Sequence, residues 1–475
     1  MATVVIGAGV GGLAAAIALA AKGEAVTVLE AQSGAGGKLL PVRFGNDMFD
    51  SGPTVLTMRW VFDTLFQLAG SDFDSALNLK PLSTLARHYW NGGAALDLFA
   101  DAAQTFDAIG RFAGKGEAQN YLAFSAKAKQ IHNALLGPFL KSQRPSLWSL
   151  TRAMPLGDAL SINPFETYWH ALGRTFNDPR LRQLFGRYAT YCGTSPFKAP
   201  ATLMLVADVE AQGVWRVEGG MAALATALEA LARRLGVSFH FNCEVAHIEN
   251  GNGSVVGVID KNKLRHACTS VVLNADSAAL TTGLFGQKFA SNEAPNSDQR
   301  SLSAVTWCAR AKTEGVVLEH HTVFFSDDYE KEFSDLRHGP AQDPTVYVCD
   351  QGDDRKLLLV NAPANNQTAP PDIDARLLRR LSKSGLTLTL DERQMVRRDP
   401  HEFAKLYPAT YGALYGRASN GWMSTFQRPA ARSKMRGLYL AGGSTHPGPG
   451  VPMAALAGLR AAEALLQDRA LMRQS

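Results

Sequence analysis

The sequence predicts an α/β fold in which a parallel-sheet domain is interrupted by a second domain of mixed sheet and by a helical insert. Near the N-terminus, a β-branched run (Thr3 to Ile6), a glycine-rich turn, an Ala/Leu-rich helix to about Lys22 and a second strand (Ala25 to Leu29) follow in order. Near the C-terminus, another strand, Leu438 to Ala441, leads through two glycines into a helix. Strand-like segments and a long stretch of helical composition lie between these ends.

The first glycines, Gly7, Gly9 and Gly12, have the G-x-G-x-x-G spacing of a Rossmann-type dinucleotide site. Gly7 permits the tight turn out of the strand, Gly9 has no Cβ to hold the backbone away from a pyrophosphate, and Gly12 lets helix and strand pack closely. The helix N-terminus offers unpaired N–H groups to the phosphates. Glu30, after the second strand, can accept hydrogen bonds from ribose hydroxyls. These features by themselves do not separate FAD from NAD.

A second glycine-rich turn follows the acid directly. Gly36 and Gly37 precede Lys38, so that a turn and a cation can reach the same diphosphate. This arrangement directly after Glu30 resembles the FAD-binding start of the flavin amine oxidase and carotenoid desaturase superfamily.

The C-terminal segment predicts a second contact region for the cofactor. Gly442 and Gly443 form a tight turn, Pro447 to Pro452 a rigid loop, and a helix runs from about Met453 to Leu466. We expect the turn to hold a ribityl-phosphate and the helix dipole to stabilise negative charge on a reduced flavin ring. Small residues in the first turns of this helix permit close approach to a neighbour.

Composition excludes several classes. The 475 residues are 46% hydrophobic and 19% charged with a net charge of +5, which argues against a dedicated nucleic-acid binder and permits attraction to an anionic surface. The cysteines are far apart, without C-x-x-C, so we predict no metal site and small buried thiols in a reducing cytosol: Cys192, Cys243, Cys268, Cys308 and Cys349. We see no signal peptide, and the longest apolar run, Leu13 to Ala21, is too short to cross a bilayer.

The middle of the chain predicts three interleaved parts. We expect residues 1–80, 213–285 and 395–475 to form the dinucleotide domain, 81–101 and 286–394 a substrate domain, and 102–212 the helical insert. We expect the sheet of the substrate domain to contain a hairpin, Ala86 to Trp90 with Ala95 to Phe99. Three later segments are expected to add strands to it: Ser301 to Ala309, Thr345 to Cys349 and Leu357 to Val360. Asp372 is expected to cap a helix that runs to about Ser384.

The helical insert carries a basic and aromatic stretch. Between Lys141 and Thr190 there are seven Lys/Arg against three Asp/Glu. The apolar and aromatic residues interleaved with them are Phe139, Leu147, Trp148, Tyr168 and Trp169. Such a mixture suits a helix that lies on a membrane surface. A solvated face over an ordinary core is the alternative, and membrane contact is favoured only if the substrate is a lipid.

The sequence is similar to the bacterial carotenoid desaturases of the phytoene desaturase family over nearly its whole length. The likeness is carried by VVIGAGVGGLAAAIALA, GAGGK, FDSGPTVLTM with WVFDTLF, and GGSTHPGPGVPMAALAG. Within that family RYATYCGTSPFKAPATLMLVADVEAQGVWRVEGGM, SLSAVTW and DPTVYVCDQ most resemble the 1-hydroxycarotenoid 3,4-desaturases, that is, the hydroxyneurosporene or methoxyneurosporene dehydrogenases of purple phototrophic bacteria. The sequence departs from many relatives at Lys38, where they have Arg, and at Gly443-Ser444.

The resemblance implies an FAD-dependent C-3,4 dehydrogenation of an acyclic 1-hydroxycarotenoid on the route to spheroidene or spirilloxanthin. It implies a substrate drawn from a membrane, and a cytoplasmic enzyme peripherally attached to the inner or photosynthetic membrane; the electron acceptor is left open between a quinone and oxygen. The implied FAD contacts are Gly7, Gly9, Gly12, Glu30, Gly37, Lys38, Val245 at the adenine, Gly442 and Gly443 at the phosphate-ribityl arm, and Val451, Pro452 and Met453 at the ring.

For the reaction, we expect the carotenoid to lose a hydride to flavin N5 and a proton from the neighbouring carbon, with the developing cation spread over the polyene. No catalytic residue is assigned, and His446 is interpreted as structural. The substrate tunnel is expected to be apolar, with a polar group that recognises the tertiary hydroxyl. The alternatives are a phytoene desaturase or other carotenoid desaturase, isomerase or saturase, an amine oxidase, and a non-redox prenyl-lipid escort protein.

Overall fold

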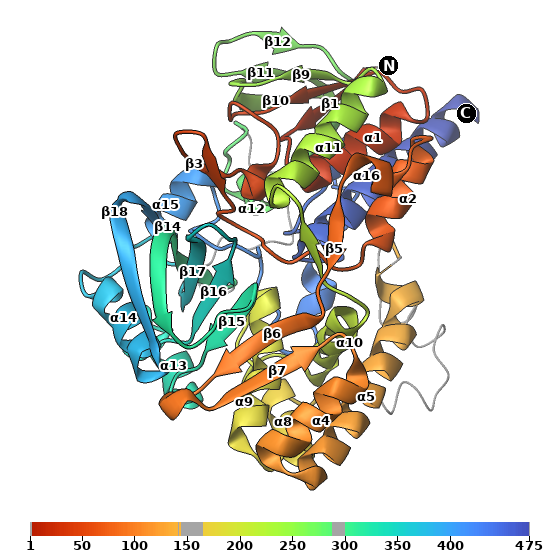
Figure 1. The fold of residues 1–475 in the computed structure, drawn as a ribbon. Coiled ribbons are helices and arrows are strands. Elements are labelled where there is room, and N and C mark those ends of the chain that lie inside the picture. Colours follow the sequence, from red (N-terminus) through yellow and green to blue (C-terminus); the bar gives the residue numbers. More distant parts are fainter. Residues whose placement is uncertain (1, 141, 144–164, 287–299, 475) are drawn as a thin grey trace.

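The computed structural model describes residues 2–140, 142–143, 165–286 and 300–474. A five-stranded parallel sheet in the order β19-β13-β1-β2-β9 forms the upper part in Figure 1. Its strands come from three separate stretches of the chain: β1 (Thr3–Ile6), β2 (Val26–Leu29), β9 (Ser238–His240), β13 (Ser270–Leu273) and β19 (Leu438–Leu440). An antiparallel sheet of β10 (Val245–Gly251), β11 (Ser254–Asp260) and β12 (Arg265–His266) lies beside it.

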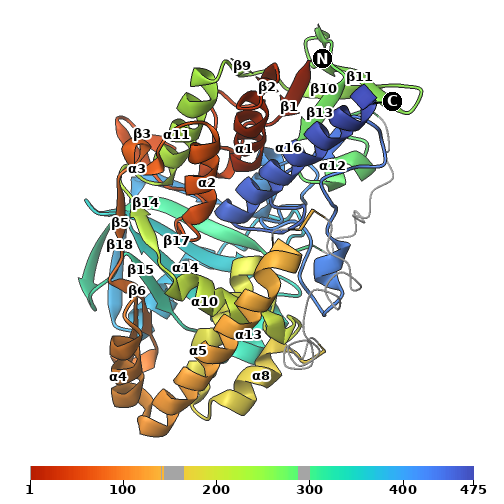
Figure 2. The ribbon, with the colours of Figure 1, turned by 90° about the vertical axis from the view of Figure 1, so that its right-hand side faces the viewer.

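Three helices pack against the parallel sheet and enclose its main core: α1 (Val10–Ala20), α11 (Met221–Arg234) and α16 (Val451–Gln474). Helices α1 and α16 lie side by side (Figure 2) because both carry small residues at their contact. A Cβ on Gly458 would lie 2.1 Å from the Gly11 carbonyl oxygen, so only glycine fits there. The predicted close approach is confirmed, but the helix begins at Val451, two residues before the predicted Met453, and continues to Gln474.

A seven-stranded mixed sheet forms the second layer, at the left of Figure 1, in the order β18-β14-β17-β16-β15-β6-β7. The predicted hairpin is present as β6 (Thr84–Tyr89) and β7 (Ala95–Phe99), and the other predicted segments as β14 (Ser303–Gly315), β16 (Val346–Asp350) and β17 (Arg355–Ala362). Two strands were not predicted, β15 (His321–Phe324) and β18 (Leu386–Arg398). β18 was missed although its first five residues, Leu386 to Leu390, alternate between apolar and polar; the polar run that follows, Asp391 to Gln394, has no such alternation. Helices α13 (Tyr329–Asp335), α14 (Ile373–Lys383) and α15 (Pro400–Leu406) are associated with this layer.

Asp372 does not cap α14 as predicted. It occupies the N-cap position without a side-chain bond to the helix backbone, and its carboxylate instead binds the Arg376 guanidinium at 2.9 Å. An ion pair therefore replaces the expected capping bond at this helix start.

The helical part at the bottom of Figure 1 contains α4 (Ala102–Ala113), α5 (Lys115–Leu135), α8 (Tyr168–Thr175), α9 (Pro179–Gly186) and α10 (Leu205–Ala211). Tyr168, one of the aromatic residues considered for a membrane surface, is wholly buried and donates to the Phe185 carbonyl at 2.9 Å. Trp169 packs on Phe197 and Tyr329. These two rings therefore belong to the core of the helical part, while Lys141, Leu147 and Trp148 lie outside the described residues.

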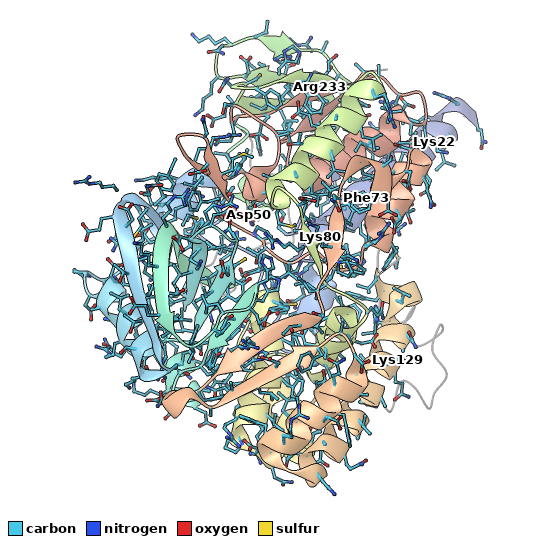
Figure 3. All side chains as sticks on the ribbon, in the orientation of Figure 1. Lys22, Asp50, Phe73, Lys80, Lys129 and Arg233 are labelled. Carbon is cyan, nitrogen blue, oxygen red and sulfur yellow. The ribbon has the colours of Figure 1, made fainter. Side chains whose placement is uncertain are left out.

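Asp50 joins two layers at the place labelled in Figure 3, between α11 and the seven-stranded sheet. Its carboxylate accepts from the Met221 backbone N–H at 2.9 Å and so caps α11, while its own N–H donates to Gln351 at 2.9 Å. A Cβ on Gly220 would lie 2.7 Å from the Asp50 carboxylate, which explains the Gly-Gly start of α11. Burial raises the pKa of Asp50, against the hydrogen bond from Met221.

We expect Asp50→Ala to lower the free energy of unfolding by about 1–2 kcal/mol, because it removes the cap of α11 and leaves its first N–H groups unpaired. The measurement is the thermal unfolding midpoint. Asp47→Ala is the matched control, because Asp47 pairs with Arg310 at an exposed site, where ion pairs contribute about 0–1 kcal/mol. Equal midpoints for the two variants would contradict the capping role.

Candidate functional site

One continuous cavity of about 1450 Å³ runs between the parallel sheet, the seven-stranded sheet and the helical part. It is larger than the roughly 300–1000 Å³ of a pocket for one small ligand. The residues at the carboxyl ends of β1 and β2 line one portion of it, and side chains from β14 to β17 and from α10 line another. The cavity therefore has room for two ligands in contact.

The glycine turn after β1 packs directly on Asn274, a residue that the sequence analysis did not assign to the site. Gly7 has a φ of +95°, and a Cβ on it would lie 2.8 Å from the Asn274 carbonyl oxygen. A Cβ on Gly9 would lie 2.7 Å from the Asn274 side-chain nitrogen, and the Asn274 amide also donates to the Gly7 carbonyl at 3.3 Å. Asn274 follows β13, the neighbour of β1, so only the sheet order brings it to this turn.

Gly12 has the packing role that was predicted for it. A Cβ there would lie 2.1 Å from the Gly7 carbonyl oxygen, because α1 begins at Val10 and its first turn crosses β1 closely. Gly12 is not among the residues that line the cavity, whereas Gly7 and Gly9 are.

Glu30 lies at the end of β2, and its carboxylate faces the same cavity. It accepts from the Ala8 N–H at 2.6 Å and from the Gln32 N–H at 2.8 Å. Burial raises the pKa of Glu30, while these two backbone bonds lower it. Each carboxylate oxygen retains a further acceptor site, so the group can still bind the hydroxyls of a ribose.

The second glycine turn packs on the first. Gly37 has a φ of +56°, and a Cβ on it would lie 3.1 Å from the Gly9 Cα. Lys38 lines the cavity, and its Nζ donates to the Leu414 carbonyl at 2.5 Å and lies 5.3 Å from the Tyr407 ring centroid. Burial lowers the pKa of Lys38, against the nearby carboxylate of Asp276, which raises it.

The other predicted contacts also line this cavity: Val245, Gly442, Gly443, Val451, Pro452 and Met453. Gly442 has a φ of +101°, and a Cβ on it would lie 2.8 Å from the Asn274 side-chain oxygen. The N-terminus of α16 at Val451 directs unpaired N–H groups and the positive end of its dipole to the cavity. Glycines and helix N-termini from both ends of the chain thus meet at one place.

His446 lies next to this turn but does not line the cavity. Its Nε2 donates to the Phe139 carbonyl at 2.9 Å, and the two rings pack edge to face. Burial lowers the pKa of His446 to about 4, against the bonds to the Phe139 and Ser142 carbonyls, so the ring is neutral at pH 7. Its contacts are those of a structural residue.

We expect His446→Gln to change kcat by less than about threefold, whereas loss of a general acid or base costs about 10²- to 10⁴-fold. The glutamine amide can donate to the same carbonyls, so the loop keeps its position. The measurement is kcat against pH for the wild-type protein and the variant. A hundredfold loss with full cofactor content would assign His446 to catalysis instead.

One row of side chains across the seven-stranded sheet forms the floor of the cavity. Thr306, Leu359, Tyr347 and Val323 stand opposite one another in successive strand pairs, and all four line the cavity. The Tyr347 hydroxyl is 2.7 Å from Thr54 Oγ1 and 2.7 Å from His321 Nδ1. The sequence predicted these strands but not which face lines the cavity, because both faces of the buried strands are apolar.

The helical wall opposite carries a charged group that the sequence analysis did not identify as a site. Arg187 Nη1 donates to the Tyr191 hydroxyl at 2.7 Å, which donates to Glu210 Oε1 at 2.9 Å. Tyr188 donates to the second oxygen of Glu210. Arg187, Tyr191 and Glu210 line the cavity, and Arg187 and Glu210 are only 6% and 3% exposed. We call these three residues the polar cluster.

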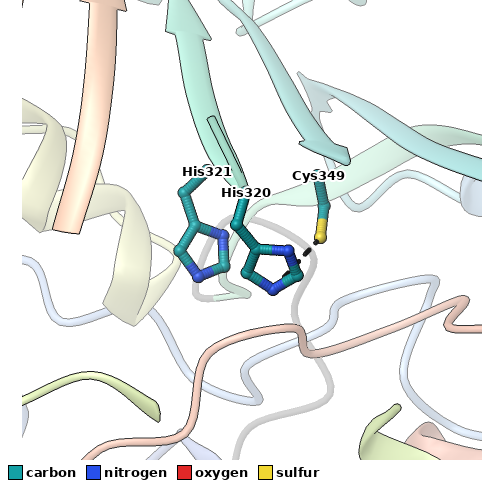
Figure 4. A group of neighbouring side chains, drawn as sticks. All are labelled: His320, His321 and Cys349. Carbon is teal, nitrogen blue, oxygen red and sulfur yellow. Dashed lines mark hydrogen bonds between the residues drawn. The ribbon is translucent and has the colours of Figure 1, made fainter. Parts of the chain in front are cut away.

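Figure 4 shows His320, His321 and Cys349, whose ligand atoms lie close enough to hold a metal ion. His320 Nδ1 already binds the Asp350 carbonyl at 2.6 Å, and His321 Nδ1 binds Tyr347. Burial raises the pKa of the Cys349 thiol well above its usual range, which disfavours the thiolate that a metal requires. A second group, Cys243, Asp260 and His266, is similarly close. We assign no metal to either.

Comparison with known proteins decides the family. Residues 10–466 match the flavin-containing amine oxidoreductases. The chain belongs to this family. It is 46% identical to a hydroxyneurosporene desaturase of Rubrivivax gelatinosus, and the alignment covers 98% of this chain and 93% of the relative. It is 30% identical to a 1-hydroxycarotenoid 3,4-desaturase of a Flavobacterium, and that alignment covers 95% of this chain and 96% of the relative. Among solved structures, a redesigned putrescine oxidase matches with a TM-score of 0.62 at 16% identity over 98% of each chain, which shows a shared fold.

A flavin is therefore the cofactor of this protein, which is an oxidoreductase with the predicted α/β fold. The residues present fit such a cofactor. At Gly7, Gly9 and Gly442 an added Cβ would lie 2.7 to 2.8 Å from Asn274, and at Gly37 it would lie 3.1 Å from the Gly9 Cα. These glycines line the same cavity as the acid at the end of β2. The family membership also confirms the resemblance that the sequence suggested.

Proposed function

We propose that this protein is an FAD-dependent desaturase that removes two hydrogens from C-3 and C-4 of an acyclic 1-hydroxycarotenoid such as 1-hydroxyneurosporene. The observation that carries the proposal is the shape of the cavity. It joins a largely apolar compartment to the turns that contain Gly7, Gly9, Gly37 and Gly442, which we call the cofactor cradle. The two desaturase relatives, which match this chain over nearly its full length, support the same substrate class.

The bound flavin would supply the two-electron chemistry as hydride acceptor. FAD, which has an adenosine for Glu30 and Val245 and a diphosphate for the glycine turns and Lys38, suits this cradle better than a shorter flavin. We infer that Gly442, Gly443 and the start of α16 hold the flavin end, and that Gly12 acts by packing. We propose the predicted domains, 1–80, 213–285 and 395–475 for FAD, 81–101 and 286–394 for substrate and 102–212 as the helical insert, except that β18 continues the substrate sheet to Arg398.

The apolar floor, Val323 and Leu359, orients a polyene, and the surrounding layers exclude water from it. No ionisable side chain is assigned as the base, because a cation on a conjugated polyene is delocalised and loses its proton readily.

We infer that the substrate reaches the cavity from a membrane to which the protein is peripherally bound. Phe165, with 73% of its surface exposed, lines the cavity and its ring lies 5.1 Å from that of Trp422, which also lines it. An exposed aromatic ring beside the cavity, with the half-buried Trp422 next to it, suits the boundary between headgroups and acyl chains. Among the described residues no helix is long and apolar enough to cross a bilayer.

The test uses flavin-loaded protein and liposomes that contain either 1-hydroxyneurosporene or phytoene, with a quinone or oxygen as electron acceptor. Pigments are separated by chromatography and identified by mass and visible spectrum. We expect a red-shifted product, two hydrogens lighter, from the hydroxycarotenoid alone. Conversion of phytoene alone would reassign the protein as an early desaturase. Gly12→Ala, which we expect to lack flavin, is the negative control.

A further inference from the structure

The burial of the polar cluster carries a free-energy cost. A guanidinium and a carboxylate are buried beside a largely apolar compartment, and burying such groups costs several kcal/mol each unless they are fully paired. The pairing is incomplete. Arg187 Nη1 binds Tyr191, but Arg187 Nε and Nη2 have no hydrogen-bond partner in the described part of the chain. A hydrocarbon in the cavity would leave these donors unpaired.

A purely structural role explains only part of this arrangement. The bond from Tyr188 to Glu210 joins the turn after α9 to α10 and does so without lining the cavity. It accounts for the burial of Glu210. It does not account for the unpaired donors of Arg187, whose guanidinium lies 4.9 Å from the Tyr191 ring centroid and 5.7 Å from that of Tyr188, contacts that give Nε and Nη2 no acceptor. The two nitrogens have almost no accessible surface, so the Arg187 side chain must turn toward the cavity for a ligand oxygen to supply the missing partner.

The polar cluster also lies on the side of the cavity where we propose that the cofactor binds. Arg187 and Tyr191 belong to a short 3-10 helix, Arg187–Cys192, that ends at Gly193, where an added Cβ would lie 2.4 Å from the Tyr415 ring. Tyr415 follows Leu414, whose carbonyl accepts from Lys38 Nζ at 2.5 Å. The cluster is therefore next to the segment that packs on the cofactor cradle.

This position matches the proposed chemistry. In a 1-hydroxycarotenoid the oxygen is carried by C-1, and the bond that is dehydrogenated joins C-3 to C-4. A group that binds the oxygen must therefore lie close to the reacting carbons and to the flavin. A polar group at the distant end of a long tunnel could not do so.

We propose that Arg187, oriented by Tyr191 and Glu210, binds the oxygen atom at the end of the substrate and selects an oxygenated polyene over the hydrocarbon of equal length. The inference rests on the proposed function and names the residues that distinguish its substrate. Arg187 donates to the substrate oxygen, and Glu210, with two of its acceptor sites still free, accepts from the hydroxyl hydrogen. The cluster is a specificity determinant and takes no part in the redox step.

The experiment compares the dissociation constants of 1-hydroxyneurosporene and neurosporene, each presented in liposomes to the flavin-loaded protein and followed by quenching of tryptophan fluorescence. The variants are Arg187→Lys, which keeps the charge opposite Glu210 and removes the two free donors, and Tyr191→Phe, which keeps the ring. Tyr188→Phe is the matched control, because Tyr188 also binds Glu210 but does not line the cavity. Kinetics with the hydroxycarotenoid are measured in parallel.

We expect the wild-type protein to bind the hydroxycarotenoid more tightly, and Arg187→Lys and Tyr191→Phe to reduce this preference by about 10- to 100-fold, the range for a lost hydrogen bond to a charged group. The loss should fall mainly on KM, with neurosporene binding almost unchanged and Tyr188→Phe close to wild type. No preference in the wild-type protein, or equal weakening for both polyenes in the variants, would overturn the inference. The binding measurement does not depend on turnover. Absence of 3,4-desaturation would therefore refute the proposed function, and the role of the polar cluster in binding would still be tested.

Discussion

Gly12→Ala is expected to yield protein without flavin. The new methyl group would lie 2.1 Å from the Gly7 carbonyl oxygen and 3.2 Å from the Asn274 Cβ. The first of these is a backbone atom that hydrogen bonding holds in place, so α1 must move away from β1, at a cost of about 3 kcal/mol or more. The movement displaces the turn of Gly7 and Gly9, on which the diphosphate depends.

The measurement is the ratio of flavin to protein absorbance after purification with excess FAD, together with the thermal unfolding midpoint. Gly116→Ala is the matched control, because Gly116 lies in α5 with no atom within 4 Å of an added Cβ. Alanine there should raise stability by about 0.5–1 kcal/mol and leave flavin content unchanged. Full flavin content in Gly12→Ala would contradict the role assigned to this turn.

The stability of the wild-type protein should fall as pH rises through about 7 because of Glu332, a carboxyl in the layer of the seven-stranded sheet. Glu332 is 2% exposed, and burial raises its pKa to about 7, against bonds from Ser326 and Thr345, which lower it. A carboxyl with a raised pKa in the folded state favours folding below its unfolded pKa of 4.5, and this contribution is lost as pH rises through about 7. The difference amounts to about 3 kcal/mol.

We expect Glu332→Gln to remove this part of the pH dependence, because the amide cannot ionise. The check is the unfolding midpoint of each protein at intervals from pH 5 to pH 8. Glu330→Gln is the control: Glu330 lies on the same helix, α13, but is exposed. Parallel curves for the wild-type protein and Glu332→Gln would show that Glu332 does not titrate in this range.

The local pattern of the chain predicts the glycine turns that we propose hold the cofactor. Gly7, Gly9, Gly12 and Glu30 are close in sequence and belong to one strand–helix–strand unit, so their spacing alone fixes their arrangement. The final turn with Gly442 could be assigned to the same cofactor because a strand, glycines and a helix start again follow in order. Strand β18 was missed although Leu386 to Leu390 alternate between apolar and polar residues, and its pairing with β14 continues to Arg398.

The sequence by itself predicted the fold class and the glycine turns, because these depend on strand, turn and helix patterns that are local in the chain. Only the tertiary structure decided that Asn274 fills the space beside Gly7 and Gly9, that Asp50 caps α11, and that Arg187, Tyr191 and Glu210 meet at one cavity wall. These contacts join elements far apart in the chain. The local pattern of the sequence does not predict these contacts. They follow from the order of the strands and from the packing of the helical part against the second sheet.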